Sequence, residues 1–210
     1  MRKKLIRYNS LSSFPNVYDA EPARVQEILF GSTKPITLEL ACGRGEYTNG
    51  LAQQFPTRNF IGVDIKGERL WQGARRSQEL LLKNTGFVRA SIDRLEYYFA
   101  AESVEEIWLI HPDPQPKRER RRLTHPKYLL KYNQLLQTGG QLHLKTDDKN
   151  LFDYSASEIS GSKSFTILQS TTDLHRSKLL KKHFDIVTNF EQKALFKSKP
   201  IYYLVATKSE

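Results

Sequence analysis

Acidic side chains stand at the ends of successive apolar runs in this sequence, where they could hold a nucleoside. Asp64 ends one run, and a carboxylate there could accept both hydroxyl protons of a ribose. Asp93 follows the next run and could meet the exocyclic amine of an adenine. Glu39 lies near the end of an earlier run and could attract an ammonium or sulfonium group by its charge. Each carboxylate alone is more often a helix cap, so the interpretation as an adenosine site depends on the whole set.

A short glycine pair, Gly43 and Gly45, follows the first of these runs. Glycines permit a tight turn and let the backbone approach a ligand closely before a helix starts. The pair alone also fits an ordinary turn between a strand and a helix. It lacks the third glycine of a dinucleotide-binding loop, since Tyr47, Thr48 and Asn49 follow. S-adenosylmethionine has no phosphate, so the shorter loop favours this cofactor over NAD.

A rigid segment, His111-Pro-Asp-Pro-Gln-Pro-Lys117, follows a further apolar run. Prolines fix φ and cannot donate to a sheet, so they make a stiff loop around Asp113. Such a loop would pre-orient this carboxylate where a transferred methyl group meets its acceptor. A basic block comes next, and its arginines suit phosphate oxygens, although charges on a solvated loop are the alternative interpretation. The block consists of Lys117, Arg118, Arg120, Arg121 and Arg122.

Alternating strand-like and helix-like segments must position these residues. Strands separated by helices imply right-handed crossovers and a mostly parallel sheet, so we expect a single three-layer, doubly wound α/β domain of the Rossmann-like type. Ligands bind beyond the carboxyl ends of such strands, near the point where the strand order reverses. The strand-like runs are Ile36–Leu40, Asn59–Asp64, Gly86–Ala90, Glu106–Ile110, Gln141–Lys145, Phe165–Ser170 and Ile201–Thr207. The helical patterns are Glu46–Gln54, Lys66–Lys83, Ile92–Phe99, Pro126–Leu136 and Asn150–Ser160, and a polar stretch up to about Asn189 shows neither pattern.

The chain is strongly basic, which indicates an acidic partner. Its 210 residues carry a formal net charge of +10 at pH 7. Nucleic acid is the leading candidate and a membrane surface the second, but no apolar run approaches the roughly 20 residues of a membrane span. The single cysteine, Cys42, fits a reducing compartment, and the basic N-terminus lacks the apolar core of a secretory signal, so we expect a cytoplasmic protein. The histidines have no metal-ligand spacing, and no metal is expected.

Several spaced motifs resemble the bacterial tRNA (guanine-N7-)-methyltransferase family, over a span from about Thr37 to Tyr203. Ala41 takes the place of the family's first loop glycine, Gln115 that of a tryptophan, and His111 that of a neighbouring aromatic residue. The matching motifs are Glu39-Leu-Ala-Cys-Gly-Arg-Gly45, Asp113-Pro-Gln-Pro-Lys117, Lys145-Thr-Asp147 and Thr188-Asn-Phe-Glu191.

The resemblance implies methyl transfer from S-adenosylmethionine to N7 of a guanine in the variable loop of tRNA, with Asp113 as the catalytic residue. We expect a basic N-terminal extension over residues 1–34 and an S-adenosylmethionine-dependent methyltransferase domain over residues 35–210, in a monomer or a homodimer. The residues implied for the cofactor are Glu39, Gly43, Gly45, Asp64, Asp93 and Asp113. Those implied for the tRNA substrate are Lys117, Asp147, Thr188, Asn189, Phe190 and Glu191.

The chemistry of guanine N7 agrees with a site built from carboxylates. N7 offers a neutral lone pair, so no base has to remove a proton before methyl transfer. The product purine is cationic, and Asp113 or Asp147 near the ring would stabilise the developing charge. Two alternatives stay open: an S-adenosylmethionine-dependent enzyme acting on another substrate, and a non-catalytic RNA-binding protein on this fold, which Gln115 and His111 suggest.

Overall fold

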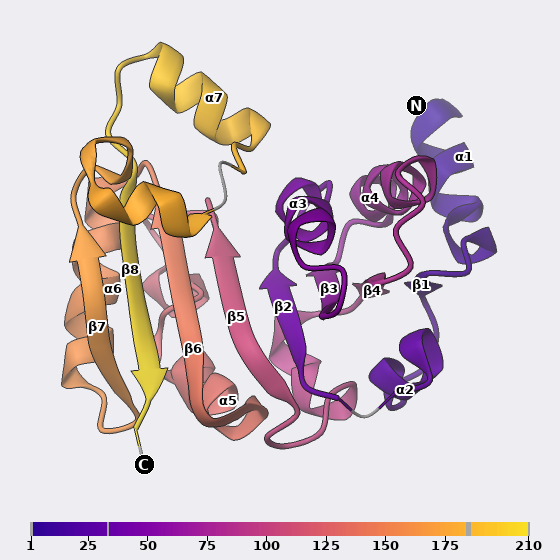
Figure 1. Cartoon of the computed structure of the whole chain (residues 1–210), viewed down its shortest axis with the longest axis horizontal. Coiled ribbons are helices and arrows are strands. Elements are labelled where there is room, and N and C mark those ends of the chain that lie inside the picture. Colours follow the sequence, from indigo (N-terminus) through magenta and orange to yellow (C-terminus); the bar gives the residue numbers. More distant parts are fainter. Residues whose placement is uncertain (1, 33, 184–185, 210) are drawn as a thin grey trace.

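An eight-stranded sheet runs through the molecule (Figure 1). The structure is a computed structural model and describes residues 2–32, 34–183 and 186–209. The strand order is β1-β4-β3-β2-β5-β6-β8-β7. Every pair is parallel up to β6, and β8 is antiparallel to both β6 and β7. The strands are β1 (Val17–Tyr18), β2 (Ile36–Leu40), β3 (Asn59–Asp64), β4 (Thr85–Arg89), β5 (Val104–Ile110), β6 (Leu136–Thr146), β7 (Phe165–Thr171) and β8 (Tyr202–Lys208).

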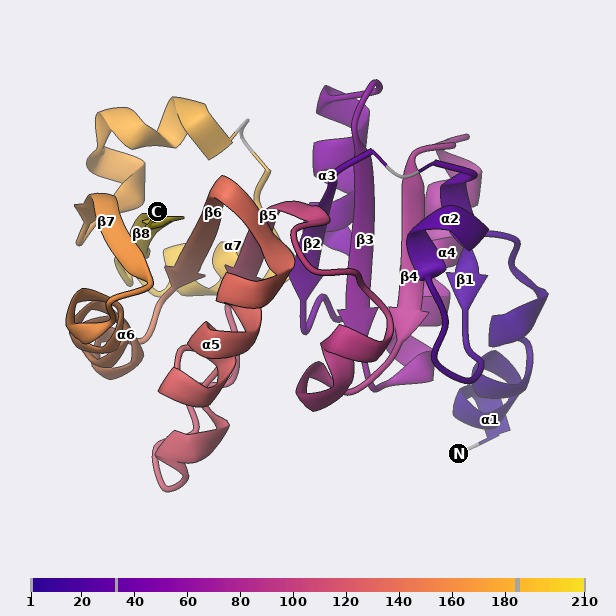
Figure 2. The same ribbon diagram turned by 90° about the horizontal axis from the view of Figure 1, so that it is seen from below.

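Helices cover both faces of the sheet, which gives the three layers expected from the sequence (Figure 2). α5 and α6 pack on one face, while α3, α4 and α7 pack on the other. The α-helices are α1 (Arg2–Asn9), α2 (Val25–Phe30), α3 (Glu46–Gln54), α4 (Gly67–Glu79), α5 (Pro126–Leu135), α6 (Lys149–Gly161) and α7 (Asn189–Phe196). Short 3₁₀ helices are η1 (Leu11–Ser13), η2 (Ile92–Tyr97), η3 (Glu119–Arg121), η4 (Leu174–Arg176) and η5 (Lys178–His183).

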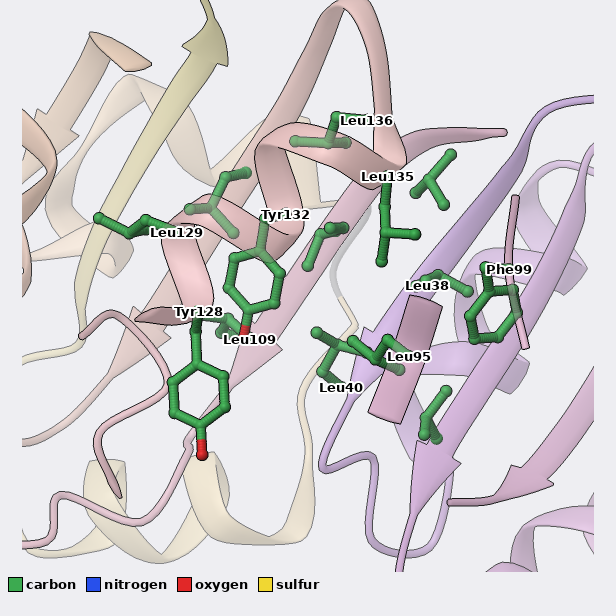
Figure 3. Close-up of a cluster of buried hydrophobic side chains, with 14 of the residues drawn as sticks. Leu38, Leu40, Leu95, Phe99, Leu109, Tyr128, Leu129, Tyr132, Leu135 and Leu136 are labelled. Carbon is green, nitrogen blue, oxygen red and sulfur yellow. The ribbon is translucent and has the colours of Figure 1, made fainter. Parts of the chain in front are cut away.

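The larger core lies between the central strands and α5. Leu109 of β5 is buried beside Tyr128 and Tyr132 of α5, and Leu38 and Leu40 of β2 are buried beside Leu95 of η2 (Figure 3). β2 is buried along its whole length, as a central parallel strand covered on both faces should be. Burial of these apolar side chains removes their surface from water, which is the main force that holds the helix layers on the sheet.

Two of the expected helices differ in extent or type. α4 ends well before Lys83, because Leu81 takes a positive φ of 56° and Leu82 N–H donates back to the Ser77 carbonyl. The helical pattern Ile92–Phe99 is corrected to the 3₁₀ helix η2, which is interrupted at Arg94 (φ −120°). A crossover this short gains too few hydrogen bonds to hold a regular α-helix.

The segment before residue 35 takes part in the sheet. β1 pairs with β4, with Val17 opposite Phe87, and Leu11 and Val25 are fully buried. A two-residue strand carries no alternation that a sequence pattern could reveal. Within the part of the chain that the structure describes, no helix is long and apolar enough to cross a membrane.

Candidate functional site

The strand order reverses between β2 and β5, and the loops that follow these two strands meet the same edge of the sheet. From β2 the chain continues to β3 and β4 on one side, and from β5 to β6 on the other. At such a switch point the two loops diverge and leave room for a ligand beyond the strand ends. The glycine loop after β2 and the proline loop after β5 are therefore placed side by side by the topology.

The glycine loop is held in a left-handed conformation at three positions. Ala41, Gly43 and Gly45 have φ values of 57°, 57° and 61°. A Cβ on Gly45 would lie 2.4 Å from the Phe87 ring, so glycine is required there for space as well as for backbone freedom. A Cβ on Gly43 would meet no atom within 4 Å among the described residues, so the backbone at Gly43 faces open space. Gly43 is the place where a ligand could approach this backbone.

Two of the predicted carboxylates support this loop. Asp64 accepts hydrogen bonds from Gly43 N–H (2.9 Å) and Lys66 N–H (2.8 Å), so it joins the loops after β2 and β3. Glu39 is 5% exposed, and its Oε2 accepts the backbone N–H of Thr48 (2.7 Å) and the Thr48 hydroxyl. Burial raises the pKa of Glu39 to about 7, although the Thr48 hydrogen bonds oppose this rise. Glu39 therefore carries an incomplete negative charge near neutral pH.

A hollow of about 390 Å³ lies beyond the ends of β3 and β4. Its lining includes Ile65, which follows Asp64, and Ala90 and Ser91, which follow β4. The N-terminal residues Asp19–Pro22 form another wall, and Asp19 is ion-paired with Arg89 at 2.6 Å. Sequence reasoning missed this contribution, because the segment carries no recognisable binding motif.

Asp93 does not line this hollow. It is exposed and pairs with Lys127 of α5, with 2.9 Å between Oδ1 and Nζ, and this contact lowers its pKa. A role at the adenine would require the ion pair to open, so the structure does not bring Asp93 to the other candidate residues.

The proline loop after β5 is strained and tightly supported. His111 and Gln115 both have positive φ, 46° and 45°, in a region that non-glycine residues rarely adopt. Asp113 is exposed, and its Oδ1 accepts the backbone N–H of Gln115 at 3.1 Å, which closes a small turn. The carboxylate is thus held from one side and open to solvent on the other.

Arg122 supports this loop instead of belonging to an open basic block. It is buried, donates from Nε to the Pro114 carbonyl (3.1 Å) and lies over the Tyr154 ring at 4.4 Å. Its Nη1 also forms an ion pair with Glu119 Oε1 at 3.1 Å. The expectation that all the arginines of the block face phosphates is therefore corrected for Arg122. Lys117, Arg118, Arg120 and Arg121 are exposed.

Asp147 follows β6 and faces the proline loop. Its Oδ1 lies 3.5 Å from Nδ1 of His111, and its Oδ2 lies 3.5 Å from Nζ of Lys199. The contact with His111, followed by the charge of Lys199, holds the pKa of Asp147 at about 2, so it is ionised at neutral pH. The His111 side chain is itself 5% exposed, and its backbone N–H donates to the Lys145 carbonyl of β6 at 2.7 Å.

The segment Thr188–Glu191 forms the start of α7, and its residues have different environments. Thr188 is buried and caps the helix by accepting Glu191 N–H at 3.3 Å. Glu191 is fully buried between Lys145 Nζ (2.7 Å) and His175 Nε2 (2.8 Å). Both side chains are buried in this conformation, and their direct contact with tRNA stays a prediction from the motif. Asn189 and Phe190 are exposed.

Asn189 ties α7 to the helix that follows the glycine loop. Its backbone N–H donates to Glu46 Oε2 at 2.7 Å, and its side-chain amide donates to Glu46 Oε1. Sequence reasoning named Lys145 only as part of a motif and gave Glu46 and His175 no role, since their partners are distant in the sequence. Among the described residues, no cluster of three or more histidine, cysteine, aspartate or glutamate side chains could hold a metal ion.

Comparisons with known proteins identify the family of this chain. Residues 33–204 match the family described as "Putative methyltransferase". A tRNA (guanine-N(7)-)-methyltransferase of Bacteroides thetaiotaomicron is 38% identical over 97% of this chain and 84% of its own length. The corresponding protein of Cytophaga hutchinsonii is 37% identical over 97% of this chain and 96% of its own length. This chain belongs to the tRNA (guanine-N7-)-methyltransferase family.

Solved structures show the same fold at low sequence identity. A 16S rRNA methyltransferase, KamB, aligns with a TM-score of 0.69 at 14% identity, over 91% of this chain and 96% of its own. An antibiotic-related methyltransferase aligns with a TM-score of 0.70 at 16% identity, over 93% and 98%. The predictions of the family, of the α/β methyltransferase fold and, through the family, of S-adenosylmethionine as methyl donor are confirmed.

Proposed function

We propose that this chain transfers a methyl group from S-adenosylmethionine to N7 of a guanine in the variable loop of tRNA, which forms 7-methylguanosine. The observation that carries the proposal is the juxtaposition of two loops at the switch point of the sheet. One loop presents open backbone at Gly43 beside Glu39 and Asp64, and the other presents Asp113 beside exposed arginines. The first arrangement suits a small cofactor, and the second suits a polyanionic acceptor.

The residues of the glycine loop fit the cofactor. S-adenosylmethionine supplies an activated methyl group on a sulfonium centre. The open space at Gly43 admits the methionine moiety, and Glu39 provides negative charge toward the ammonium or sulfonium region. The hollow beyond β3 and β4 has space for the nucleoside, and Asp64 directly precedes Ile65, which lines it. Asp93 would join only after release from Lys127.

The acceptor side needs no base, because N7 attacks through a neutral lone pair. The ring gains positive charge during transfer, and a preorganised carboxylate beside it stabilises such charge. Asp113, exposed at the tip of a loop that prolines and Arg122 hold in place, is proposed as the catalytic residue. Asp147, ionised at neutral pH, is proposed to accept hydrogen bonds from guanine N1–H and N2–H₂. Lys117, Asn189 and Phe190 are exposed and are proposed as further contacts with tRNA.

Incubation of the protein with unmodified tRNA and methyl-labelled S-adenosylmethionine tests the proposal. Digestion to nucleosides should give label in 7-methylguanosine, and tRNA lacking the variable-loop guanine should give none. Label in a protein or in another nucleoside would favour the alternative of a methyltransferase with a different substrate. Absence of S-adenosylmethionine binding in calorimetry would favour a non-catalytic RNA-binding protein. We propose that the reaction takes place in the cytoplasm, in a monomer or a homodimer.

Asp113→Asn tests the catalytic role separately. Asparagine retains the Oδ1 acceptor for Gln115 N–H, so the turn should persist while the negative charge is lost. We expect transition-state stabilisation to fall by about 2–4 kcal/mol, with tRNA affinity close to the parent's. Single-turnover rates at saturating S-adenosylmethionine measure this change. A near-parental rate would reduce Asp113 to a turn-forming residue and make Asp147 the better candidate for the group that faces the guanine.

A further inference from the structure

α7 and the residue that follows it, Lys197, present two phenylalanines and two lysines to solvent. Phe190 is 68% exposed and Phe196 is 91% exposed, and Lys193 and Lys197 are exposed beside them. Residues three or four positions apart share a side of a helix, so the spacing 190, 193, 196 and 197 gathers these side chains on the outer side of α7. This set of four residues is called the Phe–Lys face below.

The orientation of this helix is fixed from its inner side. Glu191 is fully buried with Lys145, which is 1% exposed, and His175 also contacts it. Removing two such charges from water is costly, and the ion pair does little more than offset that cost. Its clear structural effect is geometric, because Glu191 can reach Lys145 in only one rotation of α7. The Phe–Lys face must then point away from the sheet.

The position of α7 places this face beside the candidate site. At its first residue Asn189 is bonded to Glu46, which opens α3 directly after the glycine loop. Shortly after its end Lys199 reaches Asp147 at 3.5 Å. α7 lies beyond the edge where β5 and β6 end, as Figure 1 shows. The Phe–Lys face is therefore next to the place where the acceptor guanine must enter.

The chemistry of the face indicates its partner. Water surrounds two phenylalanine rings within one short helix, and no carboxylate among the described residues pairs with Lys193 or Lys197. The centres of protein–protein interfaces are depleted in lysine. Alternating rings and cations instead suit unpaired nucleotides, whose bases stack on aromatic rings while their phosphates meet lysines.

We propose that the Phe–Lys face binds unpaired nucleotides of the tRNA next to the methylated guanine, with bases on Phe190 and Phe196 and phosphates on Lys193 and Lys197. This rests on the proposed function, since it names the part of the substrate that the face receives. Stacking and charge contribute in different ways. Removal of a stacking ring weakens binding at every salt concentration, whereas removal of a phosphate-binding lysine also reduces the salt dependence.

Equilibrium binding of an unmodified tRNA transcript, measured over a range of salt concentrations, separates the two contributions. Phe190→Ala with Phe196→Ala should weaken binding by at least about fivefold per stacked base, with an unchanged slope of log affinity against log salt. Lys193→Gln with Lys197→Gln should reduce that slope by about 0.7–0.9 for each phosphate that is no longer bound. Phe196→Tyr keeps an aromatic ring and should bind as the parent does.

Two exposed residues elsewhere serve as matched controls. Leu130→Ala on α5 removes a comparable exposed apolar side chain, and Lys163→Gln between α6 and β7 removes a lysine outside α7. Neither should change tRNA affinity, and S-adenosylmethionine affinity should remain parental in all variants.

Parental tRNA binding by the double phenylalanine variant would overturn the proposal. A changed oligomeric state of that variant with unchanged tRNA binding would instead assign the face to a second copy of the chain. Because binding is measured without turnover, failure of the parent to form 7-methylguanosine would count against the proposed reaction and not against this surface.

Discussion

The ionisation of the buried Glu39 side chain couples both the stability of the protein and cofactor binding to pH. It is 5% exposed, and burial raises its pKa from 4.5 to about 7. The folded protein therefore binds this proton more tightly than the unfolded chain does. Stability from this group is greatest below pH 4.5 and is lost as the pH rises toward 7, by about 3 kcal/mol at most. A cationic cofactor would offset the loss, because it favours the ionised carboxylate.

Glu39→Gln should remove this pH dependence, because a neutral amide has no proton to lose. We expect the free energy of unfolding of the variant, relative to the parent, to increase between pH 5 and pH 8. The affinity of the parent for S-adenosylmethionine should rise over the same range, while the variant should bind weakly at both ends of it. Urea titrations and calorimetry at several pH values measure the two effects. Parallel stability profiles for the two proteins would contradict the assigned ionisation.

The positions of single residues could be predicted from the sequence where the end of a strand determines them. They could not be predicted where a partner distant in the sequence determines them. Asp64 closes a β-run, so its place at the sheet edge could be inferred from the pattern alone. The burial of Glu191 could not be inferred, because its partner Lys145 lies on a strand far away in the sequence. Arg122 likewise looked like any other arginine of the block, and only the fold shows that it holds the Pro114 carbonyl.

At the scale of elements, the strands and the longer helices were predictable, because apolar runs bounded by turns recur along the central part of the chain. β2 and β3 have the predicted limits, and β4 is shifted by one residue. α7 was missed, since its buried positions are a glutamate and an alanine and its phenylalanines face water. Its hydrophobic pattern is therefore opposite to that of a helix packed on a core.

The glycine loop offers a test with a built-in control, because Gly43 and Gly45 have nearly the same φ but different surroundings. Gly43→Ala meets only the cost of a left-handed conformation, about 1 kcal/mol, and should weaken S-adenosylmethionine binding by filling the open space. Gly45→Ala must also displace Phe87, which adds about 1–3 kcal/mol of overpacking. Thermal unfolding and cofactor titration of both variants measure these effects. Equal destabilisation of the two would contradict the close packing at Gly45, and parental cofactor affinity of Gly43→Ala would remove the loop from the binding site.

At the scale of the whole molecule, two groups of exposed cations lie near the candidate site. The net charge of +10 attracts tRNA in general, and these two groups could bind it at specific places. The arginines near η3 adjoin the proline loop, and the lysines of α7 lie beyond β5 and β6. An elongated tRNA could contact both groups while the guanine enters between them.

Neutralisation of the exposed loop arginines tests this arrangement against a general effect of charge. Arg118→Gln, Arg120→Gln and Arg121→Gln together should weaken tRNA binding and reduce its salt dependence by at most about 0.7–0.9 for each phosphate that is released. S-adenosylmethionine affinity should hardly change, since the proposed partners of these side chains are phosphates and not the cofactor. Arg122→Gln removes the same charge from a buried position, where it supports Pro114 and pairs with Glu119. We expect this variant to lose stability and turnover but to keep the parental salt slope. Equal slopes for the triple variant and the parent would show that the loop arginines only solvate the surface, and the tRNA would then have to be recruited by α7 alone.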